Sequence, residues 1–248
     1  DQLKGAAAVG NMNLAWFSTW LPGEDGEYPV VNQTNAESDT YFWDGTADTK
    51  YAGGTGTKED PYIIKTPAQL YGALSTVTGT TSGVHANESK EVAGGVQSGT
   101  MLRQGSTTDY VPVYTPYYYK IADGVKNFYF NNVYGNETLA GIKALVASGK
   151  AKAWTPGKSF VGHLDCNGVN IYGMYSSNGT GFVYKLDGPA TIKNINFSAC
   201  YSKGTGVTAI LTTNLGSYAN DTTLHYVDNI SVRESRTETT AKVTQYTD

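Results

Sequence analysis

The chain has 248 residues and a net charge of −4, and 40% of its residues are hydrophobic while only 16% are charged. With 29 Gly and 19 Tyr, it is too apolar and aromatic to be disordered and too poor in charge to be mainly helical, so we expect an all-β fold rich in turns. Nucleic acid is not an expected partner because Lys and Arg form no cluster, and membrane insertion is not expected because no apolar run approaches the roughly 18 residues of a span.

Residues 1–40 are expected to form a terminal strand or cap segment, which either packs on the main body or is the end of a preceding module, and residues 41–248 are expected to form the main body. The N-terminal segment contains an aromatic run, "LAWFSTW", which stops at a Pro-Gly turn and is followed by a short "YPVV" strand. Because the opening "DQLKGAAAVG" lacks the pattern of a secretory signal, we expect either a mature chain or a part of a larger protein.

A glycine-rich turn, a short strand and a helix are predicted next along the chain. The sequence "GGTGTK" at 53–58 lacks the full spacing of a phosphate-binding loop and is followed by acidic residues and Pro, so it predicts a turn ahead of a strand at 62–64. Thr66 and Gln69 have the spacing of a capping box, which predicts a helix over 67–77.

The segment 78–112 is polar, rich in Gly, Ser and Thr, and aperiodic. It predicts a long surface loop, with at most a short strand at 100–103. Aromatic residues that favour strands return at 118–121 and 128–130.

A second helix is predicted over 137–148. Asn136 is the expected start, Leu139 and Leu145 belong to one apolar stripe, and Gly149 is the expected stop. Both helices are expected to be peripheral to the β body.

An Asn-Ile pair occurs three times in the second half of the chain, in "VNIYGMYSS", "TIKNINFS" and "DNISVRES". The asparagines Asn170, Asn194 and Asn229 are 24 and 35 residues apart, which is typical of stacked supersecondary units. From residue 160 onward, short strands alternate with turns and no helix intervenes, which favours a parallel β-helix whose strands pair from coil to coil. The three asparagines would then form a ladder at equivalent turns. A β-sandwich or jelly roll is the alternative.

Several segments resemble a known family. The segment 42–74, "FWDGTADTKYAGGTGTKEDPYIIKTPAQLYGAL", and the later "FVGHLDCNGVNIYGMY" and "GFVYKLDGPATIKNINF" resemble modules of large bacterial surface proteins related to the GLUG-type repeats. The resemblance covers roughly 41–235 and implies a right-handed parallel β-helix, which is a solenoid. Together with the helices and the loop read from the residues above, the expected fold is an all-β solenoid with two short peripheral helices and a long surface loop. The chain departs from the pattern in the 78–112 segment and the 133–153 helix, and has Cys166 and Val169 where Gly and His are commoner in the family.

Four aspartates are candidates for the carboxylate site of a polysaccharide-active enzyme, since parallel β-helices also carry lyases and glycoside hydrolases: Asp123, Asp165, Asp187 and Asp228. Each stands beside Gly or Asn, or one residue away, in a pattern typical of turns, where aspartate caps its own backbone. We therefore expect no catalytic residue. The enzyme alternative predicts that at least two of the four converge in one groove.

Five aromatic residues in or beside irregular segments are candidates for binding a glycan: Trp43, Tyr114, Tyr117, Tyr119 and Trp154. Exposed aromatic rings can stack on the apolar faces of sugar rings. The alternative, which we favour, is that the tyrosines fill strand positions and form ladders.

Cys166 and Cys200 are read as two buried thiols, with a disulfide as the alternative. The histidines are far apart in sequence and His163 is read as a strand residue, so neither a metal nor a cofactor is expected.

The sequence favours a non-catalytic extracellular module of a bacterial cell-surface protein, either adhesin-like, glycan-binding or a structural spacer. Its expected partners are a polysaccharide or a host surface protein, and its expected setting is a larger multimodular chain at the cell surface. The alternative function is a polysaccharide lyase or glycoside hydrolase on a β-helix.

Overall fold

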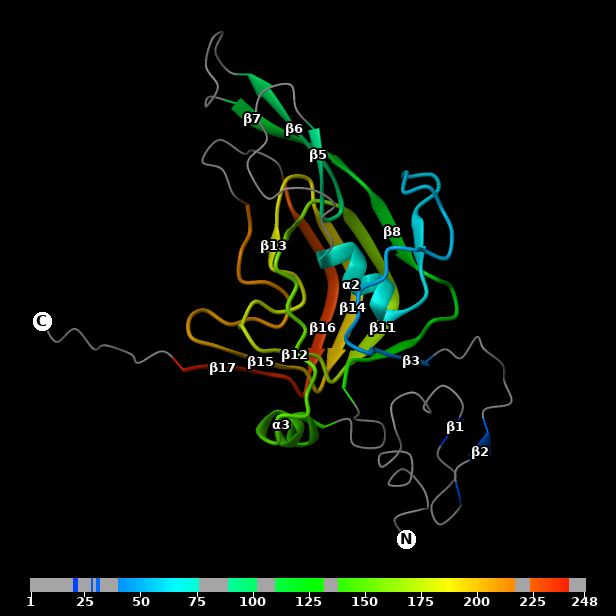
Figure 1. Cartoon of the computed structure of the whole chain (residues 1–248), viewed down its shortest axis with the longest axis vertical. Coiled ribbons are helices and arrows are strands. Elements are labelled where there is room, and N and C mark those ends of the chain that lie inside the picture. Colours follow the sequence, from blue (N-terminus) through cyan, green and yellow to red (C-terminus); the bar gives the residue numbers. More distant parts are fainter. Residues whose placement is uncertain are drawn as a thin grey trace, which may run out of the picture.

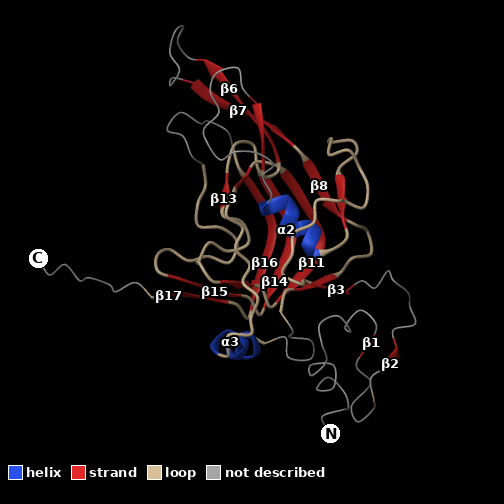
Figure 2. Cartoon of the chain, viewed as in Figure 1, coloured by secondary structure: helices blue, strands red, loops and turns tan. Residues whose placement is uncertain are grey.

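The computed structural model describes residues 20–21, 28, 30–31, 40–75, 89–101, 110–131, 138–216 and 224–240. Within these ranges the protein is mostly β, with two short helices (Figure 1; Figure 2). No helix in the described ranges is both long and apolar enough to span a membrane.

The largest sheet has seven strands, and every pair in it is parallel. Its order is β16-β14-β11-β8-β4, and β9 pairs with both β11 and β3. The strands are β3 (Thr40–Phe42), β4 (Tyr62–Ile64), β8 (Tyr118–Ile121), β9 (Asn127–Tyr129), β11 (His163–Tyr172), β14 (Thr191–Ser198) and β16 (Tyr226–Arg233). The strands predicted at 62–64, 118–121 and 128–130 are therefore confirmed to within a residue.

Two smaller parallel sheets accompany the large one. One has the order β12-β15-β17, and the other pairs β10 with β13. From β11 to β14 the chain passes from the large sheet to the first small sheet, then to the second, and back to the large sheet. From β14 to β17 it alternates between the large sheet and the first small sheet. The strands are β10 (Ser159–Phe160), β12 (Tyr175–Ser176), β13 (Lys185–Leu186), β15 (Tyr201–Gly204) and β17 (Arg236–Thr239).

The prediction of a surface loop over 78–112 is wrong in the part that the structure describes. Three antiparallel strands occur there, β5 (Ser89–Val92), β6 (Gly95–Met101) and β7 (Tyr110–Pro116). The glycines that suggested a loop serve a hairpin instead, because Gly94 has a positive φ of 84° in the two-residue turn between β5 and β6. Gly94 also lies so close to the ring of Phe160 that a Cβ there would clash.

The first predicted helix is confirmed as α2 (Pro67–Ser75). The Thr66 hydroxyl accepts a hydrogen bond from the Gln69 backbone N–H (3.2 Å), and the Gln69 side-chain oxygen accepts one from the Lys65 N–H (2.7 Å). Leu70 and Leu74 are buried in the main core, so α2 closes that core at the β4 end.

The second predicted helix is confirmed as α3 (Leu139–Ala147), but it starts later than expected. Its N-cap is Thr138, whose hydroxyl accepts from the Gly141 N–H at 3.1 Å, whereas Asn136 lies outside the described residues. The expected stop is confirmed, since Gly149 has a φ of 70° and donates to the Val146 carbonyl.

The core lies between the parallel sheets and is rich in aromatic rings, including Phe128, Phe160, Phe182 and Phe197. Cys166 and Cys200 are free thiols within this core, as the favoured reading expected. Burial raises the pKa of both thiols, that of Cys200 to about 12, so neither forms a thiolate at neutral pH.

The N-terminal segment contributes two short described strands, β1 (Trp20–Leu21) and β2 (Val30–Val31), which pair in antiparallel fashion. They fall in the aromatic run and the "YPVV" strand that the sequence predicts. Most of residues 1–39 lie outside the described ranges, and Thr40 belongs to β3 of the large sheet.

Candidate ligand-binding site

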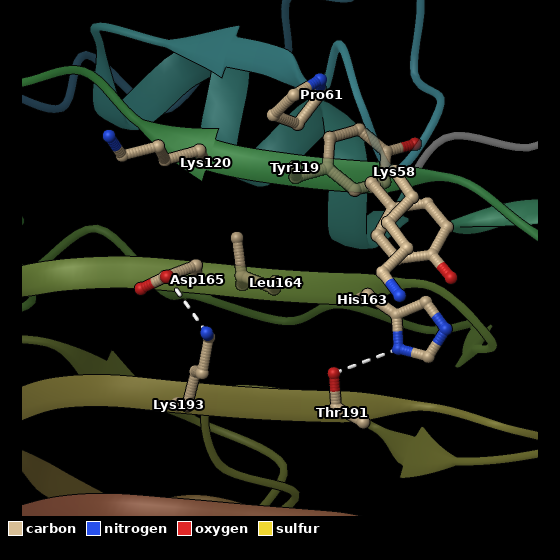
Figure 3. Close-up of a pocket in the computed structure, with 10 residues that line it drawn as sticks. Lys58, Pro61, Tyr119, Lys120, His163, Leu164, Asp165, Thr191 and Lys193 are labelled. Atoms are coloured by element: carbon tan, nitrogen blue, oxygen red, sulfur yellow. Dashed lines mark hydrogen bonds and ion pairs between the residues drawn. The ribbon is translucent and has the colours of Figure 1, made fainter.

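A cavity of about 320 Å³ opens on the large sheet where β8, β11 and β14 lie side by side (Figure 3). Its polar lining comes from these strands and from the turn before β4: Lys58, Lys120, His163, Asp165, Thr191 and Lys193. Rings and apolar side chains complete it: Pro61, Tyr118, Tyr119 and Leu164. The volume is at the small end of the range for ligand pockets.

His163 occupies the centre of one column of side chains across the sheet. Parallel register places Tyr118 and Thr191 on either side of it. The His163 ring packs against that of Tyr118, with centroids 4.4 Å apart and planes tilted by 33°, and its Nδ1 hydrogen-bonds to the Thr191 hydroxyl at 2.9 Å. Because Nδ1 is engaged, Nε2 is the ring nitrogen left for a ligand. Burial, and to a lesser extent the nearby charge of Lys58, lower the pKa of His163, which favours a neutral ring at pH 7.

Lys58 reaches over His163 from the glycine-rich turn (Figure 3). The turn is closed by Thr55 and Gly56, whose N–H groups both donate to the Asp60 carbonyl, and it is tied to β8 by a bond from the Tyr118 N–H to the Gly56 carbonyl. The predicted turn at 53–58 is thus confirmed. Across the described ranges, the Lys58 ammonium makes no ion pair or hydrogen bond, so it is an available cation at the mouth of the cavity.

A second column alternates in charge, in the order Lys120, Asp165, Lys193 and Asp228 on neighbouring strands. Lys193 lies 3.1 Å from Asp165, while Lys120 lies 2.7 Å from Asp123 in the following turn. Burial raises the pKa of Asp165, but bonds from Asn194, the Asn167 N–H and Lys193 outweigh it and lower this pKa below its usual range. Hydrogen bonds from Lys120 and Asn167 lower the pKa of Asp123.

The four candidate aspartates are divided between two places. Asp123, Asp165 and Asp228 lie along one face of the large sheet, while Asp187 is buried after β13, 3.6 Å from Lys185. The expectation of turns is confirmed for Asp123 and Asp187, whereas Asp165 and Asp228 belong to strands β11 and β16. Asp165 does cap its own backbone, because it accepts a hydrogen bond from the Asn167 N–H where the register of β11 shifts. Since Asp123 and Asp165 are held ionised, neither is suited to act as a general acid at neutral pH.

The predicted asparagine ladder exists, but Asn170 belongs to a different column. Asn229 donates to Asn194 (2.9 Å), and Asn194 donates to Asp165 (2.8 Å). Asn170 instead pairs in register with Asn196 and donates to Asn127 (2.9 Å). The reason is a bulge in β11 between Asp165 and Val169, which shifts the register by two residues.

Three of the five candidate aromatic residues are buried, so the prediction of an exposed platform is wrong for them. Trp43 and Trp154 lie in the main core with centroids 5.2 Å apart, and Tyr119 is 5% exposed. Tyr114 and Tyr117 are half-buried, and the Tyr117 hydroxyl donates to Glu91 at 2.9 Å. Burial and then Glu91 raise the pKa of Tyr117 to about 12.

Tyrosine ladders of the kind favoured by the sequence do occur. Phe42, Tyr129 and Tyr172 stack in one column with centroids 5.0 Å apart at each step, and Tyr175 stacks on Tyr201 in another. Because these rings pack against α3, we assign both ladders a structural role in the folded protein.

Sequence reasoning missed Lys58 and Tyr118, and it read His163 only as a strand residue. Residues 58, 118 and 163 are far apart in the chain, and only the pairing of β8 with β11 and the bond from Tyr118 to Gly56 bring them together. Across the described ranges, no group of three or more His, Cys, Asp or Glu side chains is placed to hold a metal ion. No protein-family model, curated protein or solved structure matches the chain.

Proposed function

We propose that the chain is a non-catalytic extracellular module of a bacterial cell-surface protein, built as a right-handed parallel β-helix, that binds an acidic glycan. The chain visits the large sheet and the two small parallel sheets in turn, and pairing is parallel in all three. This supports a coiled architecture over a sandwich, because the sheets of a sandwich are antiparallel. The resemblance of residues 41–235 to surface-protein modules supports the location.

The observation that carries the ligand assignment is the unpaired Lys58 beside His163 over a partly apolar cavity. Three lysines and one aspartate line the cavity, so its fixed charge favours an anion. Pro61 and Tyr118 offer apolar surface for a sugar ring, and the His163 Nε2 offers a polar contact. A saccharide with a carboxylate or sulfate matches this combination.

We expect the protein to bind acidic glycans on a glycan array, and Lys58→Ala to weaken that binding about five- to tenfold, as the loss of one charge-assisted contact would. Lys150→Ala is the matched control, because Lys150 is an exposed lysine that follows the Gly149 stop of α3 and does not line the cavity. Equal affinity of Lys58→Ala and the parent chain for every bound glycan would contradict this site.

A polysaccharide-active enzyme is the second candidate, because Asp165 and Asp228 flank Lys193 on one face of the sheet. The glycans bound on the array distinguish the two functions when they are incubated with the protein and separated by mass. Shortened or unsaturated products that disappear in Asp165→Asn would favour the enzyme, whereas intact glycans support a binding module.

The pKa of His163 provides an independent check of the site. We expect Lys58→Ala to raise this pKa part of the way towards 6.5, since it removes the neighbouring charge but not the burial. An imidazole titration by NMR measures the shift, and a bound acidic glycan should raise the pKa of the parent chain in the same way. Because the unfolded chain binds this proton more readily than the folded one, His163 should lower stability as the pH falls below about 6.5. A pKa that stays the same or falls in Lys58→Ala would show that Lys58 does not face the ring.

A further inference from the structure

The two ends of the large sheet are finished differently. At the β4 end, α2 places Leu70 and Leu74 in the core and closes it. At the other end, β16 pairs only with β14, so its outer edge presents unpaired backbone groups in the described structure. Figure 1 shows β16 and β14 together in the centre of the body, in orange-red and yellow-orange.

The core columns continue into β16 but are not covered there. Val227 and Val232 are in register with Ile192 and Phe197. Ile192 and Phe197 are fully buried, whereas Val227 and Val232 are 43% and 51% exposed. Among the described residues, most other exposed large hydrophobic side chains also fall after residue 204, either before β16 or at its first residue: Val207, Leu215, Leu224 and Tyr226. Burying this surface would favour the addition of another strand.

The asparagine column is open at the same edge. Asn194 and Asn229 have positive φ values of 59° and 51°, and each donates its side-chain amide to the preceding strand. In the described structure, no donor reaches the side-chain oxygen of Asn229. The strand that would best continue this column beside β16 therefore carries an asparagine at this position, with apolar residues two positions before it and one and three positions after it.

One segment of the chain has this pattern. Residues 9–15, "VGNMNLA", match 192–198, "IKNINFS", and 227–233, "VDNISVR", with apolar residues at the first, fourth and sixth positions and Asn at the third. In this alignment Val9, Met12 and Leu14 continue the columns of Val227, Ile230 and Val232, and Asn11 continues that of Asn229. The alternation of apolar and polar positions fixes the register.

We propose that residues 9–15 of a second copy add as a parallel strand to the free edge of β16, so that copies associate head to tail. The contact joins two different surfaces, the N-terminal segment and the β16 edge, and such contacts extend into chains of molecules. It is strand addition, in which backbone hydrogen bonds provide affinity and the side-chain columns provide register.

Disulfide trapping between copies of the 248-residue chain tests the register. Asn13 is predicted to lie opposite Ser231, within the Cα separation that a disulfide requires. We expect a mixture of N13C and S231C chains, incubated with oxidised glutathione, to give a disulfide-linked heterodimer as its main product. The matched control mixes N13C with N196C, since Asn196 is in the same column as Ser231 but one strand further from the edge, out of disulfide reach.

Three outcomes would overturn the proposal. They are equal cross-linking in both mixtures, no cross-linking in either, and a monomer closed by an internal disulfide in the N13C/S231C double variant, which would place the segment on its own chain. Sedimentation provides a second measurement that needs no cysteine. The parent chain should associate with rising concentration, and Leu14→Lys, which leaves β16 unchanged, should remain monomeric.

Discussion

Replacing Trp154 by alanine is expected to destabilise the protein by about 3 to 5 kcal/mol, the usual cost of removing a buried tryptophan. The Trp154 side chain is fully buried, and its ring stacks on Phe182 with centroids 5.7 Å apart and planes 4° apart. It also meets Trp43 and Phe130 edge to face, and its Nε1–H donates to the Phe182 carbonyl at 2.8 Å. Truncation therefore leaves a large cavity and an unpaired carbonyl.

Urea unfolding followed by circular dichroism measures this change. Trp154→Phe is the informative companion, because it retains a ring for the stack and loses the N–H donor, so its cost should be well below that of alanine. Tyr184→Ala controls for the loss of an aromatic ring on the surface, since Tyr184 is among the exposed large hydrophobic residues. If Trp154→Ala and Tyr184→Ala unfold at the same urea concentration, Trp154 does not hold the core together.

The strands and helices could largely be predicted from the sequence because their signals are local. Thr66 and Gln69 mark the start of α2, Gly149 marks the end of α3, and apolar alternation marks β14. The antiparallel sheet of β5, β6 and β7 was missed because its glycines are equally typical of loops, and only the contact of Gly94 with Phe160 shows that they permit close packing.

Long-range features were harder to predict. The Asn170 column depends on the bulge in β11, where Asn167 and Gly168 both have positive φ, and the spacing of Asn-Ile pairs does not reveal the extra residues. Trp43 and Trp154 lie in segments without regular strands, which suggested exposure, but here the irregular segments fill the core between sheets. The cavity was missed because Lys58 reaches His163 only through the hydrogen-bonded turn at 53–60.

Asn194→Ala is expected to destabilise the protein by about 2 to 5 kcal/mol, through two separable effects. Asn194 has a φ of 59°, a conformation that costs most residues other than glycine and asparagine roughly 1 to 2 kcal/mol. Its side chain also donates to Asp165 and accepts from Asn229, and each such bond contributes about 0.5 to 1.5 kcal/mol. Alanine keeps the backbone requirement while removing both bonds.

Asn194→Gly separates these effects, because glycine adopts a positive φ without strain and removes only the side-chain bonds. We expect it to cost about 1 to 2 kcal/mol less than alanine in urea unfolding. Asn196→Ala is the matched control in the same strand, since Asn196 donates one bond to the Gly168 carbonyl and does not have a positive φ. Should glycine cost as much as alanine, the column of hydrogen bonds would be the main contribution of Asn194. If both substitutions cost no more than Asn196→Ala, the column of asparagines with positive φ does not stabilise the large sheet. Asn229, at the free edge of β16, would then give no reason to expect an asparagine in an added strand.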